Sequence, residues 1–218
     1  TVCHVLRYTD FWMKIKEIVS EGVIGDVASV QLNENVEYMH MSHSFVRGNW
    51  GNSDTSSPMI LQKSCHDMDI ISYIIDKKCE RVSSYGSLMH FNETNKPDGA
   101  PKRCLEGCPV ADSCPYHAGN YYLGRGRGWA GAFVNDVNDN DEIIDALWNT
   151  DYGKCVYQSD NNVVDHQVVN MEFEGGATAT FSMCGFTREQ TRIVQIMGTK
   201  GEIRGNMSDN SISIFNFQ

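Results

Sequence analysis

The stretch HQVVNMEFEGGATATFSM, residues 166–183, decides the fold. In residues 166–173, two sets of side chains alternate with a period of two, as in a strand that shows one face to solvent. Gly175 and Gly176 follow, and glycine supplies the positive φ of a tight hairpin turn. Apolar residues alternate again on the return: Ala177, Ala179, Phe181 and Met183. The stretch therefore predicts an antiparallel hairpin.

Further strands and three helices are expected outward from this hairpin. Strand-like patterns cover residues 26–33, 81–91, 192–197, 202–204 and 211–217. Helical spacing of apolar residues covers residues 11–21, with Asp10 as a cap, 58–75 and 142–148. We predict the α+β class: a large open, mainly antiparallel or mixed β-sheet with helices packed on one face.

Composition and charge exclude several classes of protein. The 218 residues carry 18 Lys and Arg against 28 Asp and Glu, a formal charge of −10, without a basic run that could bind nucleic acid. No apolar run approaches the ~18–20 residues of a membrane span. Five of the eight cysteines are spread singly through apolar patterns, which favours a reducing compartment, the cytoplasm.

The ends suggest a fragment of a longer protein. Residue 1 is Thr, residues 2–8 resemble a strand already under way, and residues 211–218 stop inside a strand pattern. We expect one α+β domain over residues 1–218, with a polar loop at 39–57 and a loop-rich insertion at 92–141 that contains a cysteine cluster.

One glycine motif tests a nucleotide-binding interpretation. Residues 126–131 match G-x-G-x-x-G, which binds a pyrophosphate only between a buried strand and a helix. The residues that follow, 132–139, are poor helix formers. A flexible loop is the better interpretation.

The cysteine cluster offers metal ligands. Cys104, Cys108, Cys114 and His117 lie in one proline-rich segment, and three thiolates with an imidazole can bind a structural zinc. A disulfide with one thiol left over, or three reduced thiols packed in a loop, are the alternatives.

The second helix contains a candidate catalytic group. Gln62, Lys63, His66 and Asp69 share one helix face, and the apolar residues 70–75 indicate that this helix is buried. The stripe could simply face water, but a buried helix needs partners or a cleft for its Lys and His. A histidine can exchange a hydroxyl proton near neutral pH, and a lysine can hold the oxygen.

Asp165 and His166, at a strand start, form a second candidate group. His166 taken alone is also explained as a histidine on the sheet face that a neighbour satisfies by a hydrogen bond.

Four motifs in this order resemble the C-terminal domain of the Gfo/Idh/MocA family of NAD(P)-dependent oxidoreductases. They are His4-Val5-Leu6-Arg7-Tyr8, Ile24-Gly25-Asp26-Val27, Lys63-Ser64-Cys65-His66-Asp67-Met68-Asp69 and Gly198-Thr199-Lys200-Gly201-Glu202. The resemblance implies a partnership with the protein's own N-terminal Rossmann domain, absent from this chain, which binds NAD or NADP. It also implies a carbohydrate substrate such as a sugar or polyol, and a homo-oligomer formed through the open sheet.

The resemblance also assigns roles to residues. His66 and Lys63 are the expected catalytic residues, with His66 exchanging the hydroxyl proton. Substrate contacts are expected from a second group: Asp165, His166, Arg7 and Trp129. The family's Glu-Lys-Pro motif is absent, and Gln62 stands where the family has an aspartate before the histidine. A carboxylate that orients His66 must therefore come from another part of the chain, or Lys63 changes how the histidine is oriented.

Two alternatives to a dehydrogenase remain open at this point. One is an NAD-dependent glycosidase of the same family, which oxidises its substrate transiently. The other is a non-catalytic, metal-stapled module for binding or dimerisation. For this chain alone we expect neither activity nor NAD(P) binding.

Overall fold

The computed structural model describes residues 3–217, which form two compact units. The first unit combines residues 1–37, 60–87 and 166–218, and the second combines residues 38–59 and 88–165. The single domain expected over residues 1–218, with a loop-rich insertion at 92–141, stays a prediction; the second unit contains this segment together with residues 38–59. Among the described residues, no helix has the length and apolar character that crossing a membrane requires.

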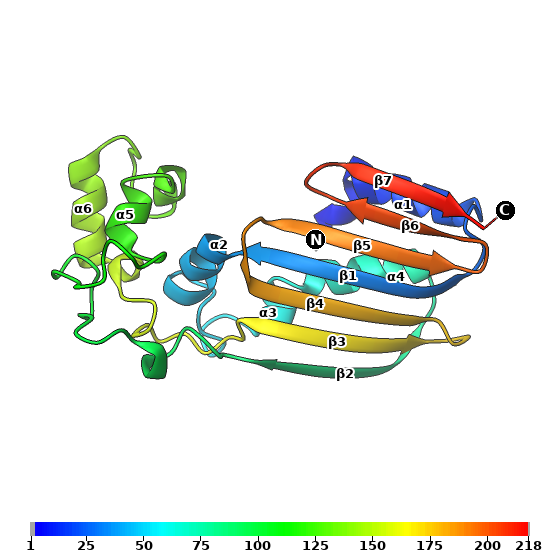
Figure 1. The fold of residues 1–218 in the computed structure, drawn as a ribbon, viewed down its shortest axis with the longest axis horizontal. Helices are drawn as coiled ribbons and strands as arrows, with labels where there is room; N and C mark the ends of the chain where they lie inside the picture. Colours follow the sequence, from blue (N-terminus) through cyan, green and yellow to red (C-terminus); the bar gives the residue numbers. More distant parts are fainter. Residues whose placement is uncertain (1–2, 218) are drawn as a thin grey trace. The chain divides into compact units, whose positions relative to one another are not determined.

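The first unit is built on a seven-stranded sheet (Figure 1). Its strands are β1 (Val27–Glu37), β2 (Cys79–Ser87), β3 (His166–Phe173), β4 (Thr178–Thr187), β5 (Thr191–Gly198), β6 (Gly201–Asn206) and β7 (Ser211–Asn216). The spatial order is β2-β3-β4-β1-β5-β6-β7. Only the β1–β4 pair is parallel among these, so the sheet is open and mixed, as predicted.

The predicted hairpin is confirmed. β3 and β4 pair antiparallel from His166 opposite Cys184 to Glu172 opposite Thr178. Gly175 and Gly176 make the turn with φ of 82° and 88°. The alternation places Phe173 and Phe181 in the core.

Helices cover one face of the sheet (Figure 1). The unit holds a 3₁₀ turn η1 (Val5–Tyr8), α1 (Asp10–Ser20), most of the short α3 (Met59–Gln62) and α4 (Cys65–Ile75). The cap of α1 is Thr9 rather than the expected Asp10, since the Thr9 hydroxyl accepts the Trp12 amide. The core between the helices and the sheet is apolar and nearly inaccessible: Ile15, Ile70, Val30, Leu32, Phe181 and Ile196.

The second unit contains short helices joined by loops. They are α2 (Tyr38–Ser42), the π-helical turn η2 (His43–Arg47), η3 (Glu93–Asn95), α5 (Ala118–Tyr122), η4 (Arg127–Ala132), α6 (Asn140–Asn149) and η5 (Asp151–Gly153). α6 confirms the helix expected at 142–148. Residues 126–131 follow α5 and lie in the 3₁₀ turns of η4 rather than between a strand and a helix, which fits the rejection of a dinucleotide motif.

Three sequence-based elements are wrong, and a fourth differs in its bounds. Residues 5–8 form a 3₁₀ turn instead of a strand, and Val2 lies outside the described residues. Residues 39–57 are not simply a polar loop, because α2 and η2 bury Met39, Met41 and Phe45. The helix expected at 58–75 is broken at Lys63 and Ser64 into α3 and α4. The strand expected at 81–91 spans 79–87.

Candidate active site

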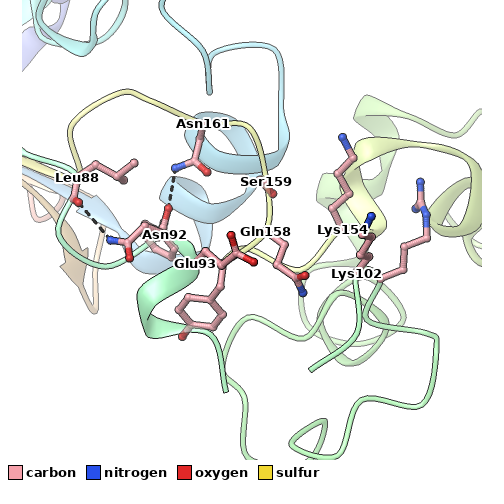
Figure 2. Close-up of a pocket in the computed structure, with 11 residues that line it drawn as sticks. Leu88, Asn92, Glu93, Lys102, Lys154, Gln158, Ser159 and Asn161 are labelled. Carbon is pink, nitrogen blue, oxygen red and sulfur yellow. Dashed lines mark hydrogen bonds between the residues drawn. The ribbon is translucent and has the colours of Figure 1, made fainter. Parts of the chain in front are cut away.

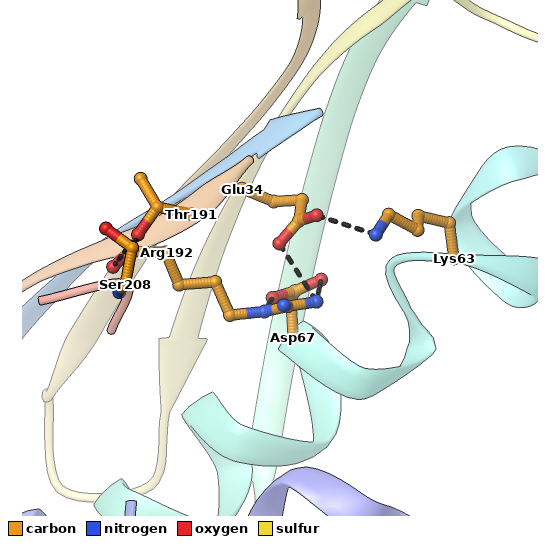
Figure 3. Close-up of polar contacts among 6 residues, drawn as sticks. All are labelled: Glu34, Lys63, Asp67, Thr191, Arg192 and Ser208. Atoms are coloured by element: carbon orange, nitrogen blue, oxygen red, sulfur yellow. Dashed lines mark hydrogen bonds and ion pairs between the residues drawn. The ribbon is translucent and has the colours of Figure 1, made fainter. Parts of the chain in front are cut away.

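Four charged side chains meet under the sheet of the first unit (Figure 3). Arg192 of β5 donates from Nε to Asp67 Oδ1 at 2.7 Å, and its Nη2 lies 2.9 Å from Glu34 Oε2. Lys63 Nζ lies 2.8 Å from Glu34 Oε1. Glu34 and Asp67 have no exposed surface. Two anions and two cations therefore form a buried, electrically balanced network.

The strand pattern explains how this network forms. The buried face of β1 continues from Val30 and Leu32 to Glu34, with a period of two. On β5, Arg192 precedes Val194 on the buried face in the same way, and the register places it directly opposite Glu34. The sequence analysis overlooked both residues. The available signal was a charged residue at a position where the alternation of the strand places buried apolar side chains.

Burial and ion pairing act in opposite directions on the two carboxyl groups. Burial raises the pKa of Glu34 and of Asp67 above their ordinary values. The charges of Arg192 and Lys63 oppose this rise at both carboxyls. The close ion pairs therefore stabilise the charged forms against the cost of burial.

A hydroxyl group anchors the strand next to Arg192. Thr191 Oγ1 donates to Asn206 Oδ1 at 2.6 Å and accepts the Ser208 amide at 3.1 Å. This contact ties the start of β5 to the turn after β6 (Figure 3). The residue that precedes Arg192 is thereby anchored.

His66 lies at the start of α4, beside this network and partly buried. Burial lowers its pKa below 6.5, and the charges of Arg192 and Lys63 add to the effect while Asp69 opposes it. Its Nδ1 has no hydrogen-bond partner among the described residues. The imidazole is therefore neutral at pH 7 and able to accept a proton.

Arg7 and Asp69 form the wall next to His66. Arg7 binds the carboxylate of Asp69 with two hydrogen bonds, from Nε at 2.7 Å and from Nη2 at 2.5 Å. The Arg7 guanidinium also lies over the ring of Tyr73, 4.6 Å from its centroid. The His4 ring meets the His66 ring edge-on at 6.0 Å. These contacts tie the turn η1 to α4.

The structure brings some of the predicted residues together. His66, Lys63 and Arg7 belong to the first unit and surround the start of α4. Lys63 is paired with Glu34 and mostly buried, and its expected role in holding the substrate oxygen stays a prediction. His166 is the first residue of β3 and is half-buried.

Two predicted substrate contacts lie in the second unit. Asp165 has no exposed surface, and its Oδ2 accepts the His90 amide at 2.7 Å. The carboxylate is therefore enclosed, and a substrate contact by Asp165 stays a prediction. Trp129 of η4 is 39% exposed and packs against the rings of His40 and His43.

The predicted zinc set of Cys104, Cys108, Cys114 and His117 is not supported. His117 Nε2 bonds the Cys104 carbonyl at 2.9 Å and its Nδ1 accepts the Asn120 amide, so both ring nitrogens are used. Among the described residues, the group of three ligand atoms that lie within 4.8 Å of one another is a different one: His4, Cys65 and His66.

A broad pocket of the second unit combines three basic side chains with one carboxylate, Glu93 (Figure 2). Lys102, Arg103 and Lys154 line it together with amide and hydroxyl side chains, and neither histidine nor cysteine is among its lining residues. Asn161 and Asn92 use their amides to hold the Phe91 and Leu88 carbonyls. The pocket has no histidine, the side chain whose ordinary pKa lies nearest to neutral pH, so α4 with His66 remains the better candidate for catalysis.

Comparison with known proteins identifies the family. The sequence model described as "Oxidoreductase family, C-terminal alpha/beta domain", of the Gfo/Idh/MocA family, matches residues 16–215. The chain belongs to this family. The match covers both the sheet and α4, so the network and His66 lie inside the family domain.

Individual relatives show the same fold. YteT of Bacillus subtilis, named as an oxidoreductase, is 27% identical over 213 residues, which are 94% of this chain and 48% of YteT. The chain thus spans about half the length of this relative.

Two solved structures share the fold at low identity. The WlbA dehydrogenase of Bordetella pertussis, in complex with NADH and UDP-GlcNAcA, has a TM-score of 0.57 at 12% identity, over 99% of this chain and 46% of its own. The scyllo-inositol dehydrogenase of Lactobacillus casei, with bound NAD(H) and scyllo-inositol, has a TM-score of 0.53 at 16% identity, over 94% and 41%.

Proposed function

We propose that this chain is the substrate-binding half of an NAD(P)-dependent dehydrogenase that acts on a hydroxyl group of a sugar, a polyol or a related carbohydrate. The observation that carries the proposal is His66, a neutral imidazole beside a rigid charge network. The ligands named for the two dehydrogenases of the same fold, a nucleotide sugar and an inositol, support the substrate class.

The cofactor in such enzymes supplies the hydride chemistry. The glycine motif at residues 126–131 is not proposed as its binding site, since it lacks the flanking strand and helix that hold a pyrophosphate. We therefore assign NAD or NADP to an N-terminal Rossmann domain of the complete protein. No residue of this chain is proposed to bind it.

The chain's own contribution is proton transfer and positioning. His66 accepts the hydroxyl proton of the substrate as the carbon is oxidised. Lys63 and Arg192 are positioning residues, because they act on His66 through their charge. Arg7, His166 and Trp129 remain proposed substrate contacts, and each is partly exposed.

The uncovered face of the sheet supports the proposed homo-oligomer. Val168 of β3 and Ile193 of β5 are 39% and 42% exposed on the face opposite the helices. An open sheet face with apolar side chains is a natural surface for self-association. Eight free thiols fit a reducing compartment, and we propose the cytoplasm.

The test uses the complete protein and a panel of sugars and polyols with NAD⁺ and NADP⁺. We expect net formation of NAD(P)H with at least one substrate. His66→Ala should lower the hydride-transfer rate by ~10²–10⁴ and leave cofactor affinity nearly unchanged. Ser72→Ala on the solvent side of the same helix is the matched control and should keep the rate.

Two outcomes contradict the proposal. Release of a free sugar without net NAD(P)H would favour the NAD-dependent glycosidase. A folded His66→Ala variant that keeps its rate but melts earlier would make His66 a structural residue.

A further inference from the structure

The basic pocket of the second unit has the size of a ligand site. Its volume is about 570 Å³, within the range of sites for small molecules. The second unit as a whole is acidic, with 13 Asp and Glu against seven Lys and Arg. Three of these seven cations line this one pocket, and Glu93 is the single acid among the described residues that line it. The pocket therefore collects positive charge against the trend of its unit.

The backbone brings these cations together. A short antiparallel bridge places Arg103 directly opposite Lys154. Next to the bridge, the Cys155 amide donates to the Lys102 carbonyl at 2.8 Å, which holds the third cation beside the other two. Side chains directly opposite each other on antiparallel strands are neighbours, and like charges at such positions are destabilising. An anion bound between them would remove this cost.

Neighbouring groups compensate these charges only in part. Lys154 Nζ pairs with Asp151 Oδ1 at 2.8 Å. Arg103 Nη1 donates to two backbone carbonyls at 2.7 and 2.8 Å, which fixes the guanidinium group without neutralising it. Within residues 3–217, no carboxylate pairs with the side chain of Arg103 or Lys102. Two of the three positive charges are therefore left without an ion pair.

The other side of the pocket offers hydrogen-bond acceptors. Figure 2 shows Glu93 and Asn161 across the pocket from the two lysines. Asn161 is only 8% exposed, and its Nδ2 donates to the Phe91 carbonyl at 3.1 Å, whereas its Oδ1 has no partner among the described residues. A buried acceptor that lacks a donor costs free energy. Glu93 is exposed, so this side suits a ligand that donates hydrogen bonds.

The lining defines the chemistry of the ligand. Ammonium and guanidinium groups form charge-assisted hydrogen bonds with a carboxylate or a phosphate. Carboxylate and amide oxygens accept hydrogen bonds from hydroxyl groups. Phe91 and Tyr157 are only 1% and 8% exposed, so they add little apolar surface. A fitting ligand is therefore small and polar, with an anionic group at one end and hydroxyl groups at the other.

We propose that the second unit binds a small acidic carbohydrate, a sugar acid or a sugar phosphate, in this pocket. Lys102, Arg103 and Lys154 hold its anionic group, and Glu93 and Asn161 accept its hydroxyl groups. Binding at this pocket needs neither NAD(P) nor proton transfer by His66. A negative result here would therefore leave the proposed dehydrogenase untouched.

Isothermal titration calorimetry on the complete protein, without cofactor, tests this site. The probes are glucuronate, galacturonate and glucose 6-phosphate, with glucose, galactose and inorganic phosphate for comparison. We expect at least one acidic sugar to bind ~10-fold or more tightly than the neutral sugars, and its binding to weaken as salt is added. The acid that binds more tightly, carboxylate or phosphate, identifies the anionic group.

Three results would overturn the proposal. The first is equal affinity for the neutral and the acidic sugars, and the second is that no probe binds. The third is inorganic phosphate that binds as tightly as every acidic sugar, because the pocket would then recognise a bare anion. None of these measurements requires a variant to fold.

A pair of variants then locates the binding. Lys102→Met removes an exposed cation that lines the pocket and should weaken binding of the acidic sugar by ~10–100-fold. Lys96→Met removes the same charge from the same unit, but Lys96 is not among the lining residues, so this control should keep its affinity. Equal affinities in the two variants would place the binding outside the pocket and refute the assignment.

Discussion

Replacing Arg192 with methionine removes the cation that joins the two buried carboxylates. Methionine keeps much of the length of the side chain and is apolar, so the change leaves little empty space. Asp67 then loses its contacts of 2.7 and 3.4 Å, and Glu34 keeps only Lys63. Two carboxylates without exposed surface would share one ammonium group.

The expected loss of stability is large. Breaking a buried ion pair by removing one partner costs about 3–5 kcal/mol, because a buried charge is left uncompensated. For a chain of this size about 1 kcal/mol corresponds to roughly 2–4 °C in Tm, so Arg192→Met should lower Tm by roughly 6–20 °C. Thermal and urea denaturation of the complete protein, followed by circular dichroism, measure the loss.

The loss should depend on pH in a defined direction. Burial raises the pKa of Glu34 and Asp67, and without Arg192 it should raise them further. A carboxyl whose pKa is higher in the folded state favours folding below its unfolded pKa, and this contribution is lost as the pH rises through the folded pKa. The deficit of Arg192→Met should thus be smallest near the ordinary values of 3.8 and 4.5 and grow toward neutral pH.

A surface arginine provides the matched control. Arg204 on the neighbouring strand β6 pairs with Glu202 at 2.8 Å, but its side chain is 61% exposed. Arg204→Met should change stability little, because exposed ion pairs contribute little. Equal losses in the two variants, or a deficit of Arg192→Met that does not shrink on acidification, would refute the buried network. In the double variant with Asp67→Asn the loss should be smaller than the sum of the single losses.

Two further predictions follow from the same unit. The acid limb of the pH profile of kcat/KM should lie below pH 6.5, because burial and the charges of Arg192 and Lys63 lower the pKa of His66. An acid limb above pH 6.5 would contradict His66 as the proton acceptor. Gly25→Ala should destabilise the protein by more than Gly22→Ala. Both glycines have φ near +70°, but only at Gly25 would an added Cβ meet Thr199 and the Lys200 backbone. Equal Tm values for the two variants would show that Thr199 and Lys200 move aside to accommodate the Cβ.

The sheet could be predicted because its signal is local. Alternation in residues 166–183 and the Gly175-Gly176 turn fix the hairpin and its register without distant information. The parallel pairing of β1 with β4 could not be read in this way, since the two strands are about 150 residues apart. The π-helical turn at His43–Arg47 was hidden for another reason: its polar residues suggested a loop, although His43 and Arg47 are buried.

The candidate site was only half visible in the sequence. The expected helix face of His66 and Lys63 is a local pattern, but the partner of Lys63 is Glu34 of β1, which also pairs with Arg192 of β5. In the strands, only alternating apolar side chains were taken as signs of burial, so Glu34 was not considered. The prediction of His117 as a metal ligand was not supported for the opposite reason. Histidine is a suitable ligand type and lies close to the cysteines in sequence, but both of its ring nitrogens form hydrogen bonds with backbone groups.

The buried network and His66 are best understood together. Lys63 and Arg192 both lower the pKa of His66, yet a pair of free cations could not be buried beside it. Glu34 and Asp67 solve this problem, because their carboxylates pair with the two cations. Burial, with the charges of the two cations added to it, lowers the pKa of His66 and so favours the neutral imidazole. A proton acceptor of this kind would need no aspartate at position 62, which is consistent with Gln62 standing where the family has its usual carboxylate.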